Sequence, residues 1–258
     1  SALDYLIKVK GYSFLEAVET IIGHTAIQAP VYEKPQLKEE NKPLLLPEKC
    51  ASNRVITEYL FGRGIDFEII NYCISNDLIF ESLPYHNVVF VGYDEKKEPK
   101  YAAYRSTNKR RIMGDCSGSK KDYSFRLGKE NLEEVHLFEC AIDLLSYATL
   151  AKLNGQDWKE MSFVSLSGVY SPAKKIEDSK VPIALEKYLG SNPSVRKIRI
   201  HFDNDIAGRK AAQTLKIILP DKYEIVDEPP KAGKDFNDFL CMQMGIYNKK
   251  THERNEER

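Results

Sequence analysis

Three acidic side chains follow two strand-like segments of the sequence. Glu139 comes directly after the apolar run at 135–138, and Asp203 and Asp205 come after the run at 198–202. Side chains alternate along an extended segment, so Asp203 and Asp205 are expected to point the same way. If the two strands are neighbours, three carboxylates converge and raise one another's pKa. A divalent cation such as Mg²⁺ resolves this conflict, because it takes a few carboxylates together with waters and leaves room for phosphate oxygens.

Each of these acids also has a simpler interpretation. Glu139 taken alone is most often just a polar residue at the end of a strand. Asp203 and Asp205 can cap the helix that is expected next, a role compatible with metal binding. Asp143 lies one turn into another predicted helix, and a surface charge is as good an interpretation as a supporting role at the site. The combination of the three acids with Gly208 favours the metal site.

The segments that must position these residues alternate between two kinds from residue 133 onward. Strands are predicted at 135–138, 163–166, 198–202 and 223–226. Helices are predicted at 141–153, 183–189, 207–219 and 236–244. This alternation favours a mostly parallel sheet covered by helices. Ligands of such sheets bind beyond the carboxyl ends of the strands, where the three acids are expected.

The residues before 133 are organised differently. Residues 1–23 show a helical pattern, and 24–47 carry several prolines among charged residues, as a linker does. Two short helices are expected over 48–75. Over 77–127 the pattern changes to strands, with a hairpin between two of them. The charged tail at 249–258 is expected to fray.

The acidic motifs resemble those of the TOPRIM domain in bacterial DNA primases of the DnaG type. Residues 138–143, Phe-Glu-Cys-Ala-Ile-Asp, are similar to the glutamate motif of that family. Residues 201–212 contain Asp-Asn-Asp-Ile-Ala-Gly and are similar to its Asp-x-Asp motif, followed by a helix. Residues 165–168 and 234–238 resemble the strand–glycine turn and the lysine–aspartate segment. The resemblance covers 133–240 and implies an α/β TOPRIM fold with a mostly parallel sheet flanked by helices.

The resemblance also implies roles for individual residues. Glu139, Asp203 and Asp205 would be both the catalytic residues and the metal ligands, with Mg²⁺ or Mn²⁺ as the cofactor. The family usually has glycine after the glutamate, where this sequence has Cys140, and this departure puts full catalytic competence in question. Residues expected to support the ligands are Asp143, Gly208 and Asp235.

The resemblance continues more faintly upstream and defines expected domains. Residues 1–23 look like the helical remnant of a primase zinc-binding module, whose metal ligands would lie further upstream, and 24–47 would be the linker. Residues 48–130 are similar to the smaller α+β N-terminal subdomain of the primase core, which helps to hold the single-stranded template. Residues 131–248 would be the TOPRIM domain and 249–258 a charged tail. Primase-like chains of this layout also occur on bacterial mobile elements.

A basic cluster follows one of the predicted strands before residue 133. Tyrosines lie nearby in sequence, and cations beside aromatic rings suit a groove for single-stranded nucleic acid. A solvated loop is an equally good interpretation of such a run. Lys234 has a stronger case, because it lies in the lysine–aspartate segment. The expected nucleic-acid-binding residues are Arg105, Lys109, Arg110, Arg111 and Lys234.

Composition limits the remaining possibilities. The 38 basic and 38 acidic residues give no net charge, so nucleic-acid binding must come from local clusters. The five cysteines are scattered and never spaced as C-x-x-C, which argues against a disulfide framework and against a complete zinc site. The sequence shows neither a signal peptide nor an apolar run of the ~20 residues that a membrane span needs. We therefore expect a cytoplasmic protein that makes no membrane contact.

Two functions stay open from the sequence. The first is a primase-like nucleotidyltransferase that acts on single-stranded DNA and nucleoside triphosphates, with a helicase or another replication protein as a further partner. The second is a TOPRIM module with weak or no catalysis that binds nucleic acid or a replication partner. A topoisomerase or nuclease would need an additional tyrosine or ATPase domain, for which the sequence offers no room. Metal-dependent primer synthesis separates the first two.

Overall fold

A computed structural model describes the chain as two compact units, 1–41 and 42–258. The described residues are 2–12, 16–17, 20–21, 42–168, 170–173 and 175–246. In the first unit helix α1 (Ala2–Lys8) is followed by Gly11, whose φ of 72° a helix cannot continue, and the described residues 16–17 and 20–21 are again helical, within the helical pattern predicted over 1–23. The predicted tail at 249–258 lies outside the described residues.

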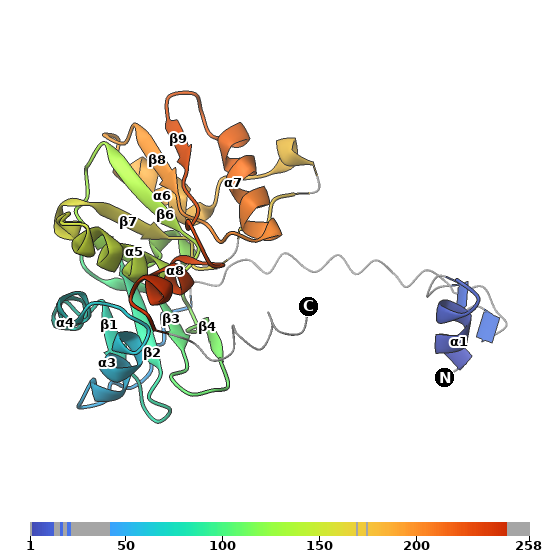
Figure 1. The fold of residues 1–258 in the computed structure, drawn as a ribbon, viewed down its shortest axis with the longest axis horizontal. Coiled ribbons are helices and arrows are strands. Elements are labelled where there is room, and N and C mark those ends of the chain that lie inside the picture. Colours follow the sequence, from blue (N-terminus) through green and yellow to red (C-terminus); the bar gives the residue numbers. More distant parts are fainter. Residues whose placement is uncertain are drawn as a thin grey trace. The chain divides into compact units, whose positions relative to one another are not determined.

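The second unit begins with two helices and an antiparallel sheet (Figure 1). The helices are α3 (Arg54–Phe61) and α4 (Phe67–Ser75). The strands are β1 (Ile79–Glu81), β2 (Val88–Tyr93), β3 (Pro99–Arg105) and β4 (Met113–Asp115), hydrogen-bonded in that order. Asp66 caps α4 through a hydrogen bond that its side chain accepts from the Glu68 amide. The predicted hairpin between β2 and β3 is confirmed.

A second sheet has five strands in the order β5-β7-β6-β8-β9. The strands are β5 (Arg126–Gly128), β6 (Glu134–Phe138), β7 (Ser162–Ser165), β8 (Lys197–Ile200) and β9 (Glu224–Asp227). The helices are α5 (Ala141–Leu153), α6 (Ile183–Ser191), α7 (Ile206–Ile218) and α8 (Phe236–Gln243). Short 3-10 turns are η1 (Lys121–Tyr123), η2 (Trp158–Glu160) and η3 (Ile176–Asp178). All pairings are parallel except β5 with β7, so the predicted mostly parallel sheet is confirmed.

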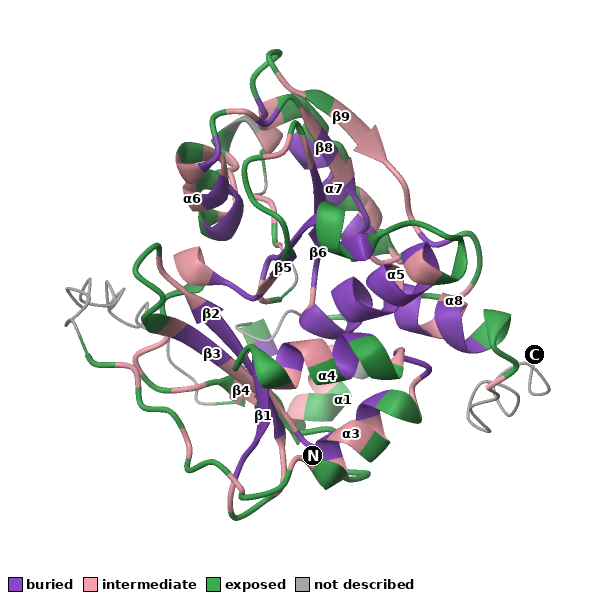
Figure 2. Cartoon of the chain, turned by 90° about the vertical axis from the view of Figure 1, so that its left-hand side faces the viewer, coloured by how far each residue is buried: buried purple, intermediate pink, exposed green. Residues whose placement is uncertain are grey.

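The central strands β6 and β7 of the five-stranded sheet are almost entirely buried, whereas the edge strand β9 is mostly intermediate and is drawn pink in Figure 2. Side chains of β6 alternate, so Val135 and Leu137 face one layer while His136 and Phe138 face the other. Val135 and Leu137 pack in a core with α6 and α7 residues. Phe138 packs in a different core with residues of α5 and α8. This helix–sheet–helix arrangement is the expected α/β fold.

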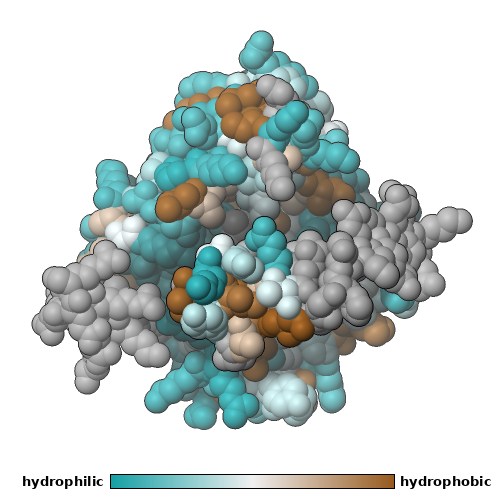
Figure 3. Space-filling view, turned by 90° about the vertical axis from the view of Figure 1, so that its right-hand side faces the viewer, coloured by the Kyte–Doolittle hydropathy of each residue, from teal (hydrophilic) through white to brown (hydrophobic). Residues whose placement is uncertain are grey.

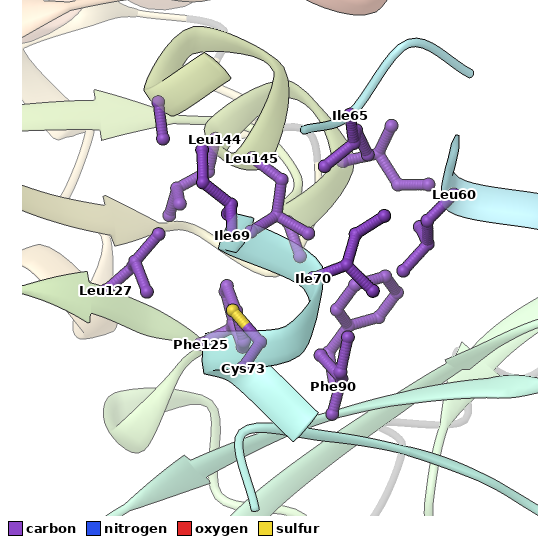
Figure 4. Close-up of a cluster of buried hydrophobic side chains, with 14 of the residues drawn as sticks. Leu60, Ile65, Ile69, Ile70, Cys73, Phe90, Phe125, Leu127, Leu144 and Leu145 are labelled. Atoms are coloured by element: carbon purple, nitrogen blue, oxygen red, sulfur yellow. The ribbon is translucent and has the colours of Figure 1, made fainter. Parts of the chain in front are cut away.

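The second of these cores continues into the antiparallel part of the molecule. Figure 4 shows side chains of α3, α4 and β2 meeting those of α5 and of the segment around β5. Among them Ile70 and Phe90 come from the first part, and Leu144 and Leu145 come from α5. Trp158 is buried in the same core. The two sheets therefore belong to one packed unit.

The surface is largely polar on the face drawn in Figure 3, where hydrophilic side chains predominate. Among the described residues no helix has both the length and the apolar character to cross a membrane. His136 and His201 are buried, and their nearly parallel rings have centroids 5.1 Å apart. Their rings are also joined by a bond of 2.9 Å between Nδ1 of His136 and Nε2 of His201.

Candidate metal centre and nucleic-acid interface

The three acids predicted to converge lie at the same edge of the five-stranded sheet. Strands β6 and β8 are adjacent and parallel, with Leu137 opposite Ile200, so both strands end at the same level. Glu139 directly follows β6, and Asp203 and Asp205 follow β8. This confirms that the two strands are neighbours, the condition on which the predicted convergence depends.

Glu139 is the most deeply buried of the three acids, with 5% of its surface exposed. The loop after β8 closes over it, since the Asp203 amide donates to Glu139 Oε1 at 3.1 Å. Its own carbonyl accepts from the Gly168 amide at 2.9 Å, which ties the end of β6 to the turn after β7. Burial and the nearby Asp203 carboxylate raise the pKa of Glu139 to about 7.

Asp203 and Asp205 share an ammonium group. Lys234 Nζ lies 3.2 Å from Asp203 Oδ2 and 3.3 Å from Asp205 Oδ2. Burial raises the pKa of Asp203 although Lys234 opposes the shift. The pKa of Asp205 is lowered, chiefly by the bond from the Gly208 amide. Burial lowers the pKa of Lys234, but its hydrogen bonds to the two aspartates outweigh this effect and raise the pKa above its usual value.

The capping role considered for the aspartates is also present at Asp205. It is the N-cap of α7, and its Oδ1 accepts from the Gly208 amide at 2.9 Å. Gly208 leaves no room for a side chain, because a Cβ there would lie 2.2 Å from the Asp203 carbonyl oxygen and 2.9 Å from Glu139 Oε1. A glycine at this helical position therefore lets α7 pack against the acidic loop.

Arg209 braces the same loop, and the sequence reasoning did not single it out. Its Nε donates to the Asp203 carbonyl at 3.1 Å, and its Nη2 donates to the Phe202 carbonyl at 2.8 Å. Its Nη1 pairs with Asp227 at 2.7 Å, which connects the loop to β9. The sequence signal for this role is the position of Arg209 directly after Ala207 and Gly208, because the first turn of α7 faces the loop that precedes it.

Asp143 is buried rather than a surface charge, so the surface interpretation is wrong. One of its oxygens accepts from Cys140 Sγ at 2.8 Å and the other from the Asn237 amide at 3.3 Å. Burial, with a contribution from the Asp235 carboxylate, raises the pKa of Asp143. Asp235 caps α8 by accepting from the Asp238 amide at 2.7 Å. Both acids thus anchor helix ends beside the candidate site.

Cysteine at position 140, where the TOPRIM family usually has glycine, causes no backbone strain. Its φ is −138° and its ψ 162°, an extended conformation that any residue adopts. The thiol is used as a donor to Asp143, and burial raises the pKa of Cys140 well above its usual value. Cysteine therefore fits where a glycine is usual in the TOPRIM family, and it leaves Glu139 in its place at the end of β6.

The residues at this edge fit a hard divalent cation. Glu139, Asp203 and Asp205 offer only oxygen ligands, the donor type that Mg²⁺ and Mn²⁺ prefer. The ammonium of Lys234 already lies between two of them, which shows that the position attracts a cation. Within the described part of the chain, the three carboxylates do not form a group with all ligand atoms within 4.8 Å. A metal with a substrate phosphate in its shell needs no such preformed cage.

The expected basic residues do not form a single group. Arg105 lies at the end of β3, where its Nε donates to the Tyr59 hydroxyl at 3.1 Å. Lys109, Arg110 and Arg111 are exposed on the connection between β3 and β4. Lys234 forms its ion pairs elsewhere, with Asp203 and Asp205 at the acidic edge.

A pocket of about 280 Å³ lies between the antiparallel sheet and the acidic edge. Tyr101, Tyr104 and Arg105 line it from β3. Cys140 and Gly168, the neighbours of Glu139 in sequence and by hydrogen bond, line its other side. Arg110 lies instead in a separate groove of about 650 Å³ together with Tyr104. Arg105 and its neighbours therefore lie beside Cys140 and Gly168, next to the acidic edge, although none of the three acids lines this pocket.

Comparison with known families defines the class of this protein. Residues 136–240 match the family described as Toprim-like. This range contains all three acids, and the chain therefore carries a Toprim-like domain. The segment before it, 58–131, matches a second family, described as Protein of unknown function (DUF3991). No curated protein matches the chain.

Solved structures similar to this chain include several primase fragments. The primase fragment of the bacteriophage T7 primase-helicase protein is 18% identical, with 72% of this chain and 69% of that chain covered and a TM-score of 0.48. The E. coli primase catalytic core is 12% identical, with 79% of this chain and 72% of that chain covered and a TM-score of 0.47. The zinc-binding and RNA polymerase domains of the Aquifex aeolicus primase are 15% identical, with 95% of this chain and 68% of that chain covered and a TM-score of 0.45.

Proposed function

We propose that this protein is a primase-like, metal-dependent nucleotidyltransferase that acts on single-stranded DNA in the replication of a chromosome or a mobile element. The observation that carries the proposal is the placement of Glu139, Asp203 and Asp205 at one edge of adjacent parallel strands. Glu139 is buried there, and the two aspartates are already neutralised by a cationic side chain. Desolvated acids of this kind are costly to a fold and are expected where chemistry requires them.

The chain's own residues account for the positioning that phosphoryl transfer requires. Mg²⁺ or Mn²⁺ bound by Glu139, Asp203 and Asp205 would neutralise the charge on the transferring phosphoryl group. Lys234, which pairs with both aspartates, would give up these ion pairs to the metal, and its flexible ammonium would then be free to pair with a phosphate of the incoming nucleotide. Gly208 and Arg209 hold the loop that carries Asp203 and Asp205.

The pocket beside this edge supports a nucleic-acid substrate. Tyr104 offers a partly exposed ring to a base, and Arg105 offers a guanidinium to a phosphate, from the same strand β3, whereas Tyr101 is buried and packs beneath them. Stacking on aromatic residues with phosphate pairing is the mode by which single strands are held without sequence specificity. With no net charge on the chain, binding is expected to be modest and to depend on these few contacts.

The test is metal-dependent primer synthesis on a short single-stranded template. Wild type is expected to join nucleoside triphosphates into a primer, with release of pyrophosphate, in Mn²⁺ or Mg²⁺, and the Asp203→Asn/Asp205→Asn double variant is expected to lose activity and Mn²⁺ binding together. Asp157→Asn, which changes an aspartate that caps η2, is the matched control and should behave as wild type. Equal Mn²⁺ binding by wild type and the double variant would contradict the metal assignment.

A second candidate function is a binding module without synthesis, which grips nucleic acid or a replication partner. The ammonium of Lys234 between Asp203 and Asp205 favours it, because an internal cation can satisfy these acids permanently. Such a module would bind a labelled single strand but synthesise no primer in any metal. In both functions, affinity should fall with salt at a log–log slope of about −0.7 per phosphate contact.

The exposed part of the basic cluster can be tested in the same binding assay. Arg110→Glu/Arg111→Glu is expected to weaken binding to different single-stranded sequences about equally, because phosphate contacts position without specifying. Fluorescence anisotropy at two salt concentrations measures the effect. Unchanged affinity would mean that these arginines belong to an ordinary solvated loop, and it would not affect the assignment of the acidic site.

A further inference from the structure

We propose that this chain holds a second metal site, for a transition-metal ion of the zinc class, at Cys50, Glu81 and His86. One ligand atom of each residue lies within 4.8 Å of the other two. Within the described part of the chain this is the one group of three or more Cys, His, Asp or Glu residues with that property. None of its members belongs to the acidic edge of the parallel sheet.

The backbone holds the three residues together from two separate segments of the chain. The Cys50 amide donates to the Glu81 carbonyl at 2.8 Å, beside an isolated bridge that pairs Lys49 with Ser82. The His86 amide donates to the Ser82 carbonyl at 2.8 Å, which folds the connection after β1 back towards Glu81. The cluster therefore rests on hydrogen-bonded backbone rather than on freely moving side chains.

The Glu81 carboxylate is oriented by groups behind it. Oε2 accepts from the Val55 amide at 2.9 Å and the Ile56 amide at 3.2 Å, at the start of α3. Oε1 is left facing His86 Nδ1, 2.6 Å away. Outer hydrogen bonds that fix a ligating carboxylate in this way are typical of protein metal sites. One oxygen thus has a structural role and the other is directed at the position shared with the imidazole.

The donor set selects the kind of ion. A thiolate, an imidazole and a carboxylate together suit Zn²⁺ and similar borderline metals, whereas Mg²⁺ prefers oxygen alone. Three protein ligands leave a fourth position for water or another ligand. The side chain of His86 is 45% exposed and Cys50 is half-buried, so solvent can reach the site. Binding would release the thiol proton of Cys50 to the solvent, because the thiolate is the ligand.

The competing explanation is an ion pair between Glu81 and His86 with Cys50 as a bystander. It accounts for the distance of 2.6 Å between the carboxylate and the imidazole, but it gives the adjacent thiol no part. Cysteine spacing gives no hint of this cluster, because its other members are not cysteines and come from a later segment. The two explanations differ in one measurable property, which is whether a bound metal is coordinated by the sulfur of Cys50.

Co²⁺ is a suitable probe, because coordination by a thiolate produces a ligand-to-metal charge-transfer absorption. We expect the reduced, metal-free chain to develop this band with one equivalent of Co²⁺ and to lose it when Zn²⁺ is added. Cys50→Ser should abolish the band. Cys116→Ser, which removes another half-buried free thiol, should keep it, and so should Asp203→Asn/Asp205→Asn.

His86→Asn gives a second measurement that does not depend on the sulfur. The φ of His86 is 52°, a conformation that asparagine also tolerates, so the variant is expected to fold. Loss of the imidazole should weaken Co²⁺ binding at least about tenfold. The proposal is overturned if wild type shows no charge-transfer band at saturating Co²⁺, or if the band survives in a Cys50→Ser variant with wild-type circular dichroism. Primer synthesis plays no part in these outcomes, so they are independent of the proposed function.

Discussion

Gly208 shows how a single missing side chain shapes the candidate metal centre. A methyl group at this position would lie 2.2 Å from the Asp203 carbonyl oxygen, so backbone would have to move. We predict that Gly208→Ala destabilises the protein by about 1–3 kcal/mol through overpacking. It should also reduce Mn²⁺ affinity, because the same shift displaces Asp203 relative to Glu139. Urea unfolding and a Mn²⁺ titration measure the two effects.

Gly190 provides the matched control for that experiment. It lies in α6, and a Cβ added there would meet nothing within 4 Å. Gly190→Ala should therefore follow the ordinary helix preference and stabilise the protein by roughly 0.5–1 kcal/mol. If both alanine variants shift stability in the same direction, then close packing around Gly208 does not explain its presence.

At the residue scale, the sequence predicted which acids lie at the site but not what neutralises them. Glu139, Asp203 and Asp205 could be found because each directly follows an apolar strand segment. The ion pairs of Lys234 with both aspartates depend on how the segment before α8 folds back towards β8, where the Asn204 amide bonds the Lys234 carbonyl at 2.6 Å. That approach is a tertiary contact, and no local pattern encodes it. The Cys50 cluster was missed for the same reason.

At the scale of elements, strand β6 carries a carboxylate whose ionisation is coupled to stability. Hydrogen bonds with His136 and Arg199 lower the pKa of Glu134 from 4.5 to about 2. The unfolded chain takes up this proton near pH 4.5 and the folded chain only near pH 2. The stabilisation is therefore complete above pH 4.5 and is lost as the pH falls towards 2.

We predict that Glu134→Gln lowers stability by up to about 1 kcal/mol at pH 6 and by clearly less at pH 3. Thermal unfolding at the two pH values measures the difference. Glu186→Gln changes an exposed glutamate of α6 and should show no such pH dependence. A deficit for Glu134→Gln that is as large at pH 3 as at pH 6 would mean that packing, not charge, is what the substitution disturbs.

Most elements of the second unit could be predicted because their signals are local. The predicted range of α5 agrees with the structure, and the ends of β7, β8 and α7 differ by one or two residues. The antiparallel pairing of β5 with β7 could not be foreseen. Strand β5 has only three residues, and its partner is reached across the whole of β6 and α5. Long-range pairing of so short a segment leaves no periodic pattern to detect.

At the scale of the whole molecule, the boundary expected between 130 and 131 crosses a continuous core. Ile70 and Phe90 on one side pack in the same cluster as Leu144 and Leu145 on the other. We therefore propose that 48–130 and 131–248 are subdomains of one folding unit. We predict that residues 131–248 expressed alone do not unfold cooperatively and bind a hydrophobic dye, because α5 would expose its apolar face.

Residues 42–248 are the control for this truncation, since they retain the whole core. This longer fragment should unfold in a single cooperative transition, measured by circular dichroism in urea. A cooperative transition of 131–248 with the same midpoint would show that the TOPRIM part is independent of the residues before it.

The shared core also limits how genes for such proteins can be rearranged. Only a few residues separate the two family segments, 58–131 and 136–240, in the sequence. In the fold, side chains of both segments pack in one continuous core. A recombination joint between them would leave each product with half of an apolar interface and no partner for it. The two segments should therefore be inherited and exchanged together. Exchange of one segment alone would require compensating substitutions among the core residues of α4, β2 and α5.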